Sequence, residues 1–368
     1  MNLRFAIASD LHIALPQTID ESATRFHLTQ FSIPALEFVL QQLESFDLDF
    51  LLLPGDLTQN GEKVNHDWLQ RKLESLPYDV YVIPGNHDVP SLQGSQNVIA
   101  YEDFPNYYGQ CGYQEQQYTR NLDYTCELAP HLQLIALNSN HFNSEGQLRG
   151  FLTEEQYSWL EGVLSRHQNS DRNNDKMTMV MIHHNIIEHI PDQTNHILGK
   201  RYMLENAHRL RSLLKKYGVK FIFTGHLHIQ DIAEDEGLYE ITTGSLITYP
   251  HPFRILQLSD RNLTIESHRI DALESVKNFP QFSQKWMSDR SFPFMTTMLI
   301  SPPLNLDLKQ AEQYAPQLKN LWSNIAQGDQ LLDFPDLPTE VNDYFKTFGA
   351  IDAQGNPQLI DNNLQINF

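Results

Sequence analysis

Five short segments combine Asp, Asn, His and Gly in patterns that could bind metal ions. They are Asp10-Leu11-His12, Gly55-Asp56, Gly85-Asn86-His87-Asp88, His183-His184 and Gly225-His226-Leu227-His228. Their carboxylate, amide and imidazole groups offer mixed oxygen and nitrogen ligation, which suits divalent Mn, Fe, Zn or Co better than Mg or Ca. The seven candidate ligands among them supply two carboxylates, one amide and four imidazoles, which are too many for one tetrahedral zinc ion. These candidates are Asp10, His12, Asp56, Asn86, His183, His226 and His228. They fit two ions that share a bridging carboxylate.

Each segment also has an ordinary structural explanation. Asp10 could cap a helix, and a Gly-Asp or Gly-Asn pair after a strand is commonly a turn. His183 taken alone is better explained as a buried histidine with its hydrogen bonds satisfied. The His226-x-His228 pair puts both side chains on one face of an extended segment, which by itself indicates a metal site only moderately. Five such coincidences in order, each at the end of a strand, favour the metal site.

The elements that must position these residues are short apolar runs, which predict buried strands. The runs are Leu3–Ala8, Phe50–Leu53, Asp79–Ile83, Met177–Ile182 and Val219–Phe223. Ligands of open α/β sheets bind at the carboxyl ends of strands, so five such ends can converge on one point. Helical spacing or capping predicts helices at Ile33–Leu43, Val64–Leu73, from Thr153, and at Leu204–Tyr217. This alternation predicts an α/β fold, with a later β-rich stretch forming a second packed sheet.

Two regions depart from the alternation. Residues 89–130 resemble an insertion rich in tyrosine, whose rings could stack a nucleobase, pack internally or contact a second subunit. From about Ala272 prolines punctuate the chain, with helices predicted at Leu308–Ile325 and Val341–Phe348. We therefore predict a domain of residues 1–270 and a mainly helical extension of residues 271–368. The extension should be dispensable for the chemistry, and its apolar stripe should be buried against the domain or a second subunit.

The ordered series D-x-H, G-D, G-N-H-D, H-H and G-H-x-H resembles that of the calcineurin-like metallophosphoesterase superfamily, over roughly residues 1–270. The resemblance implies a four-layer α/β/β/α sandwich with two mixed sheets. It implies that one ion takes Asp10, His12, Asp56 and His228. It implies that the other takes Asp56, Asn86, His183 and His226, so that Asp56 bridges them. Many phosphodiesterase members have proline after the H-H pair, whereas this chain has Asn185, which leaves the substrate contacts of that loop open.

The motif pattern is most similar to that of bacterial cyclic-nucleotide and glycerophosphodiester phosphodiesterases, which implies hydrolysis of small phosphodiesters. A bridging hydroxide would attack phosphorus and His87 would protonate the leaving group, with Asp88 orienting His87 or its loop. The predicted substrate contacts are Asn86, His87 and His184, with Arg201 and Tyr202 as further candidates. The alternatives are a phosphomonoesterase, a nuclease, or a non-enzymatic interaction protein, which the intact ligand set disfavours.

Charge and composition narrow the partners. A formal net charge of −20 over 368 residues disfavours nucleic acid and anionic membrane, while a two-metal site stays locally positive and can attract phosphate. Cys111 and Cys126 are too few for a disulfide framework and are expected as free thiols. No run of 18 apolar residues occurs, and no signal-peptide apolar region precedes Asp10, so we expect a cytoplasmic protein. A homo-oligomer is one way of covering the apolar stripe.

Overall fold

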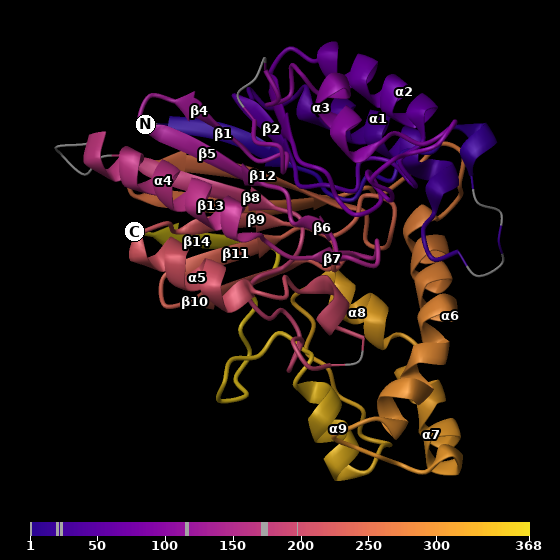
Figure 1. Cartoon of the computed structure of the whole chain (residues 1–368). Helices are drawn as coiled ribbons and strands as arrows, with labels where there is room; N and C mark the ends of the chain where they lie inside the picture. The colour runs from indigo at the N-terminus through magenta and orange to yellow at the C-terminus, as the bar shows by residue number, and fades with distance from the viewer. Residues whose placement is uncertain (1, 20–21, 23–24, 115–117, 171–175, 197) are drawn as a thin grey trace.

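Two six-stranded sheets form the centre of the protein in a computed structural model that describes residues 2–19, 22, 25–114, 118–170, 176–196 and 198–368 (Figure 1). The first sheet has the order β14-β13-β12-β1-β2-β3. Its strands are β1 (Asn2–Ile7), β2 (Phe50–Leu53), β3 (Asp79–Val82), β12 (Pro252–Ser259), β13 (Asn262–Arg269) and β14 (Leu364–Asn367). In this sheet β1, β2 and β3 are mutually parallel, whereas β12, β13 and β14 pair antiparallel.

The second sheet has the order β10-β11-β9-β8-β5-β4. Its strands are β4 (Tyr124–Ala129), β5 (Leu132–Leu137), β8 (Met177–Ile182), β9 (Phe221–Thr224), β10 (Asp231–Asp235) and β11 (Leu238–Thr242). The strands β5, β8, β9 and β11 are parallel, and β4 and β10 flank them antiparallel, so this sheet is also mixed. A separate small hairpin pairs β6 (Asn140–Phe142) with β7 (Leu148–Gly150).

Helices cover the outer faces of the two sheets. Those that follow the first strands are α1 (Ser32–Leu43), α2 (Lys63–Glu74) and the short α3 (Phe104–Tyr107), and those over the second sheet are α4 (Glu154–Ser170) and α5 (Ala207–Lys216). In Figure 1, α1 and α2 lie on one side of the strands and α4 and α5 on the other. The predicted four-layer α/β/β/α sandwich with two mixed sheets is therefore confirmed.

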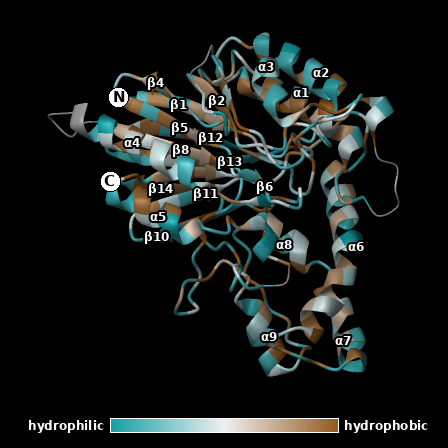
Figure 2. Cartoon of the chain, viewed as in Figure 1, coloured by the Kyte–Doolittle hydropathy of each residue, from teal (hydrophilic) through white to brown (hydrophobic). Residues whose placement is uncertain are grey.

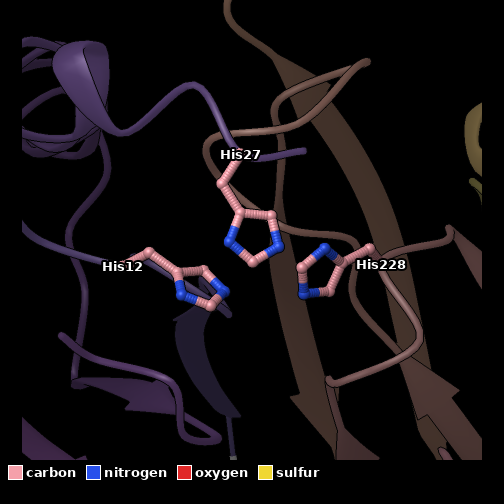
Figure 3. Close-up of side chains that lie close together, drawn as sticks. All are labelled: His12, His27 and His228. Carbon is pink, nitrogen blue, oxygen red and sulfur yellow. The ribbon is translucent and has the colours of Figure 1, made fainter. Parts of the chain in front are cut away.

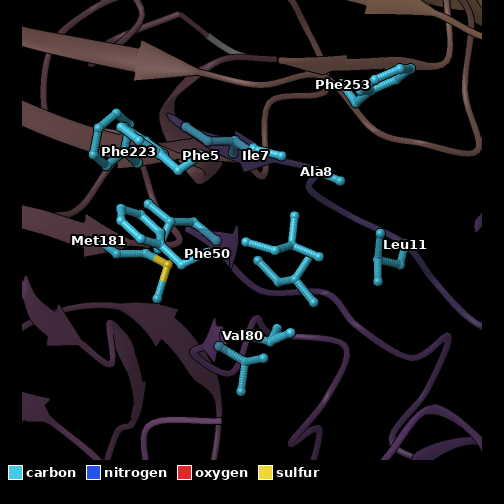
Figure 4. Close-up of a cluster of buried hydrophobic side chains, with 14 of the residues drawn as sticks. Phe5, Ile7, Ala8, Leu11, Phe50, Val80, Met181, Phe223 and Phe253 are labelled. Carbon is cyan, nitrogen blue, oxygen red and sulfur yellow. The ribbon is translucent and has the colours of Figure 1, made fainter. Parts of the chain in front are cut away.

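Aromatic and aliphatic side chains from both sheets form the central core. Phe5 on β1 stacks on Phe50 of β2 with 4.7 Å between ring centroids, and meets Phe223 of the second sheet edge-on at 5.8 Å (Figure 4). Hydrophobic residues accordingly concentrate in the strands, while polar residues mark the outer helical surfaces (Figure 2). Because the interior is apolar, the polar residues that follow each strand lie at the edge of the sheets.

Residues 89–130 contribute to the same core. Phe104, Tyr108, Tyr113 and Tyr124 are almost fully buried, and the Tyr124 hydroxyl donates a 3.0 Å hydrogen bond to the carbonyl of Val82. Strand β4 at the end of the segment extends the second sheet. Of the three interpretations of these aromatic residues, internal packing is the one that the structure supports.

The extension after residue 270 differs from its prediction in two places, the first of which is the helix predicted at Leu308–Ile325. The predicted single helix Leu308–Ile325 is wrong, because α7 (Leu308–Tyr314), a 3-10 turn (Ala315–Leu318) and α8 (Leu321–Gln327) occupy it. Pro316 lacks a backbone N–H and its ring obstructs the preceding turn, so an α-helix cannot run through it.

A long helix, α6 (Phe279–Ile300), precedes these elements and was not predicted. Pro280 lies in its first turn, where a missing N–H costs little, whereas Pro293 lies inside the helix. The second predicted helix is present as α9 (Thr339–Lys346). The four helices gather beyond one end of the sheets, in orange and yellow in Figure 1.

Most of the apolar stripe of the extension is buried within this protein, although Leu308 at its start is 58% exposed. Leu318 and Leu321 belong to a buried cluster that also includes Leu227 and Ile229, the neighbours of the predicted ligand His228. The chain then returns to the first sheet, where β14 pairs with β13. The division at residue 270 stays a prediction. None of the helices in the described ranges is long and apolar enough to cross a membrane.

Candidate metal centre

The predicted ligands follow parallel strands, so the carboxyl ends of these strands point to one edge of the sandwich. Asp10 and His12 follow β1, Asp56 follows β2, Asn86 follows β3, His183 follows β8, and His226 and His228 follow β9. The first three strands are neighbours in one sheet, and β8 and β9 are neighbours in the other. The two sheets therefore bring their polar strand ends together from opposite sides.

The side chains form two groups that share Asp56. In the first group, ligand atoms of Asp10, His12, Asp56 and His228 all lie within 4.8 Å of one another. In the second group, the same limit holds for Asp56, His183 and His226. Asn86 joins the second group, since its Oδ1 lies 3.2 Å from His183 Nε2. The structure thus brings all seven predicted ligands together in the predicted division, while their binding of ions stays a prediction.

Asp56 lies at the centre of the cluster. Its Oδ2 is 3.4 Å from His183 Nε2 and 3.7 Å from His12 Nε2, and its Oδ1 accepts a 2.8 Å hydrogen bond from the backbone N–H of His87. Burial raises the pKa of Asp56, but nearby histidines, His183 first, outweigh it and hold that pKa well below its ordinary value. The carboxylate is therefore ionised, as a bridging ligand must be.

His12 shows that the residues present fit a metal ion. The side chain is fully buried, and neither ring nitrogen has a hydrogen-bond partner within the described part of the chain. Burial lowers the pKa of His12 well below its ordinary value, so the ring is neutral with a nitrogen lone pair available. A buried imidazole without hydrogen bonds is costly unless something else satisfies it. A divalent cation between His12 and Asp56 would do so.

The partners behind the ligands orient them. His183 Nδ1 donates to the carbonyl of Pro54 at 2.8 Å, which directs Nε2 toward Asp56 and Asn86. Burial lowers the pKa of His183, but Asp56 outweighs it and raises the pKa to about 9. Histidine binds metal ions in its neutral form, so a bound cation would displace the proton that this shift favours on His183.

The backbone of the site is strained where the ligands stand. Asp10, His12, Asp56, His226 and His228 adopt positive φ angles of 52°, 42°, 51°, 67° and 60°. Non-glycine residues rarely adopt this region, at a cost on the order of 1–3 kcal/mol each, and such residues cluster at functional sites. The strain turns each side chain out of its strand direction and toward the shared space.

Two glycines allow the loops to approach this closely. A Cβ atom at Gly85 would lie 2.2 Å from Asp56 Oδ1, and one at Gly225 would lie 2.3 Å from Asp10 Oδ2. Neither contact is sterically allowed, so the G-N-H-D and G-H-x-H motifs need glycine for packing around the carboxylates. This requirement accounts for the glycine in both motifs.

His87, the predicted acid, lies next to the ligands without joining either group. Its Nδ1 donates to the backbone carbonyl of Gln59 at 2.6 Å, which leaves Nε2 as the other nitrogen able to carry a proton. The ring meets His12 edge-on with 4.7 Å between centroids. His87 lines the pocket described below.

Asp88 acts on the loop rather than on the His87 ring. Its carboxylate is fully buried and accepts hydrogen bonds from the backbone N–H groups of Leu57, Thr58 and Gly85 at 3.0, 2.7 and 2.8 Å. It therefore ties the loop after β2 to the loop after β3. Of the two orienting roles predicted for Asp88, these contacts favour the role in the loop.

His184 and Asn185 have different surroundings. His184 lines the pocket, and its Nδ1 forms a 2.7 Å hydrogen bond with Ser139 Oγ. Its ring packs against that of His226 with 4.4 Å between centroids. Asn185 is fully buried, and its amide nitrogen donates to Glu240 Oε1 at 3.0 Å. Asn185, which departs from the family pattern, thus holds its loop through Glu240 and does not line the pocket.

A cavity of about 560 Å³ opens over the cluster. Asn86, His87, His184, Arg201 and Tyr202, the predicted substrate contacts, all line it. The extension lines it too, with Arg290, Ser291, Phe294, Met295 and Trp322. Since α6 and α8 form part of the pocket wall, loss of the extension would alter the pocket, while its dispensability for the chemistry stays a prediction.

His27 was not among the residues predicted from the sequence. Its ring lies 4.1 Å from that of His12 and 5.0 Å from that of His228, between centroids, and Figure 3 shows the three rings facing one another. No apolar strand directly precedes His27, so the signal that identified the other ligands was absent.

This chain is similar in sequence to several known proteins. A family model described as "Calcineurin-like phosphoesterase" matches residues 3–230. "Probable cyclic nucleotide phosphodiesterase" of Moraxella catarrhalis is 26% identical over 195 residues, 52% of this chain and 62% of that protein. "Probable glycerophosphodiester phosphodiesterase" of Arcobacter nitrofigilis is 30% identical over 185 residues, 49% of this chain and 56% of that protein. This chain thus matches about three fifths of the length of these relatives.

Among solved structures, a dimetal phosphatase from Danio rerio superposes with a TM-score of 0.54 and 17% sequence identity, covering 73% of this chain and 96% of that chain. At this identity the similarity shows a shared fold.

Proposed function

The chain belongs to the calcineurin-like phosphoesterase family, and we propose that it is a binuclear metal-dependent phosphodiesterase acting on small phosphodiesters such as cyclic nucleotides or glycerophosphodiesters. The observation that carries this proposal is the pair of ligand groups that share Asp56 beneath a cavity of about 560 Å³. A site of this kind suits phosphoester hydrolysis, because two ions can clamp the attacking and leaving oxygens.

The ion positions follow from the two groups. Asp10, His12, Asp56 and His228 would hold one ion, and Asp56, Asn86, His183 and His226 would hold the other. When bound, the ions would polarise the phosphoryl oxygens and lower the pKa of water toward ~7. The mixed nitrogen and oxygen donors suit Mn, Fe or Zn.

The role of His87 in this proposal is to protonate the leaving alkoxide. The Gln59 carbonyl, 2.6 Å from Nδ1, keeps a proton on that nitrogen and fixes the orientation of the ring. His87 then delivers the Nε2 proton into the pocket. General acid catalysis by such a group contributes roughly 10²–10⁴-fold. Asp88 holds the loop in place for this step.

The shape of the pocket favours diesters over monoesters. Besides the candidate ligands, its wall includes the apolar residues Phe26, Leu148, Leu198, Leu227, Phe294, Met295 and Trp322. A diester carries two organic groups, of which one leaves and the other can rest on this wall, whereas a small monoester would leave much of the wall in water. The names of the two curated relatives support the same substrate class. The charge of −20 disfavours a nuclease.

Hydrolysis of a substrate panel tests the proposal. The full chain would be freed of metal, loaded separately with Mn²⁺, Fe²⁺ or Zn²⁺, and assayed on 3′,5′-cyclic nucleotides, glycerophosphodiesters and phosphomonoesters. We expect kcat/KM to be highest for a diester and about two ions bound per chain. A preference for monoesters, or one ion per chain under every loading condition, would contradict it. The variant Asp56→Ala serves as the inactive control.

A further inference from the structure

His27 reaches the metal cluster from a segment outside the five motifs. A ring nitrogen of each of His12, His27 and His228 lies within 4.8 Å of the other two. Ligand atoms of one ion with bonds of about 2.1 Å are about 3–4 Å apart, so the three nitrogens are near the spacing that a shared ion requires. Figure 3 shows the rings converging on one space, with His27 between the other two.

The hydrogen bonds of His27 leave it available for an ion. Within the described residues its ring has one hydrogen-bond partner, Gln59, whose Oε1 lies 3.4 Å from Nδ1, at the long limit for a hydrogen bond. His12, its nearest ring neighbour, has no hydrogen-bond partner on either nitrogen within the same residues. Two adjacent imidazoles that satisfy so few of their nitrogens are poorly explained by packing alone.

Helix α6 of the extension holds the segment that carries His27. Trp286 Nε1 donates to the carbonyl of Phe26 at 2.9 Å, and Arg290 Nε donates to the carbonyl of Arg25 at 2.6 Å. The guanidinium of Arg290 also lies over the Trp286 ring, 3.1 Å from its centroid. These bonds fix the two residues before His27 against the extension.

We propose that His27 is a third imidazole ligand of the ion held by Asp10, His12, Asp56 and His228, positioned there by α6. The proposal rests on the binuclear centre of the proposed function. The 4.8 Å limit joins His27 to His12 and His228 but not to the group that contains Asp10 and Asp56, so a small movement of its ring would complete a set of three nitrogen and two carboxylate ligands. Added nitrogen favours Zn²⁺, Co²⁺ or Fe²⁺ over Mn²⁺, so His27 tunes which metal the first position prefers.

Metal titration tests the role of His27 without relying on activity. Co²⁺ and Mn²⁺ would be titrated into the metal-free full chain by calorimetry, with the Co²⁺ absorption spectrum reporting coordination. The variants are His27→Ala and His27→Gln, with Trp286→Phe to loosen the segment while keeping the imidazole. His208→Ala, at an exposed position on α5, is the matched control for loss of a histidine.

In both His27 variants we expect one of the two Co²⁺ sites to weaken by at least about tenfold, with a changed Co²⁺ spectrum and a smaller loss for Mn²⁺. Trp286→Phe should weaken the same site less, and His208→Ala should match the unaltered chain. The proposal is overturned if both His27 variants keep both Co²⁺ affinities and the spectrum, including the case in which only KM rises. An unaltered chain that binds a single ion would instead count against the proposed function.

Discussion

Replacing His87 by alanine should separate catalysis from metal binding. His87 belongs to neither ligand group, and its ring contacts the ligand His12 only edge-on at 4.7 Å between centroids. The backbone N–H of residue 87, which bonds Asp56 Oδ1 at 2.8 Å, survives the substitution. We therefore expect His87→Ala to bind two ions like the unaltered chain while losing the proton donor.

The size of the loss follows from what the ring can do. Only Nε2 can donate into the pocket, because Nδ1 is committed to the Gln59 carbonyl at 2.6 Å. Losing one such donor costs roughly 10²–10⁴-fold when the leaving group is a basic alkoxide. At 1.36 kcal/mol per factor of ten, this is about 2.7–5.4 kcal/mol of transition-state stabilisation. A nitrophenolate leaves without protonation, so diesters with that group should lose far less.

The assay is a series of diesters that share one organic group and differ in the leaving group. For each, kcat of the unaltered chain, His87→Ala and His87→Gln would be measured at equal metal content. We expect the dependence of log kcat on leaving-group pKa to be steeper in both variants. Parallel lines, with the same loss on alkoxide and nitrophenolate esters, would refute the acid role. A loss of bound metal would show that His87 supports the ligands instead.

Three further outcomes are expected. Asp56→Ala should lose both ions, as measured by elemental analysis. It should also lose more activity on an activated diester than His12→Ala does. Near-normal turnover by Asp56→Ala would contradict the bridging role. Removal of residues 272–368 should leave a chain that still binds metal but aggregates, which sedimentation would measure. Its preference for diesters, measured as a ratio of kcat/KM values, should be reduced. Unchanged KM values would contradict this. Burial lowers the pKa of His189, but buried carboxylates, Glu240 first, outweigh it and raise the pKa to about 10. The stability that this ion pair provides should be complete below about pH 6.5 and lost as the pH rises to about 10. Denaturant titration should show this fall in the free energy of unfolding in the unaltered chain and not in His189→Gln.

The cluster of candidate ligands was predictable because its residues lie shortly after apolar strands. The runs Phe50–Leu53 and Met177–Ile182 are β2 and β8 to the residue. Asp56 lies three residues after the first run, and His183 follows the second directly. Parallel neighbours share an edge, so the positions of Asp56 and His183 were fixed by the strand pattern. The strand pattern did not predict the order of the strands or the pairing of β1 with β12, because a hydrophobic pattern does not say which strand pairs with which.

Features that depend on packing between distant segments could not be predicted. His27 reaches the cluster because α6, more than 250 residues later, holds the preceding backbone. The prolines that mark the extension mislead in both directions, since Pro293 is tolerated within α6 while Pro316 divides α7 from α8. Local propensity is only a weak guide when tertiary contacts decide whether a helix continues.

The pairing of β1 with β12 has a consequence for how the protein is made. Asn2 pairs with Ser259, so β1 waits for its antiparallel neighbour during the synthesis of about 250 residues, on the order of 10–50 s at about 5–20 residues per second. For most of that interval Asp10 and His12 are attached to a strand whose sheet is incomplete, and His228 has not yet been added. The ligand group proposed for the first ion is therefore complete only after residue 228 of 368. In the proposed function, metal supply would affect a later stage of maturation than the start of folding.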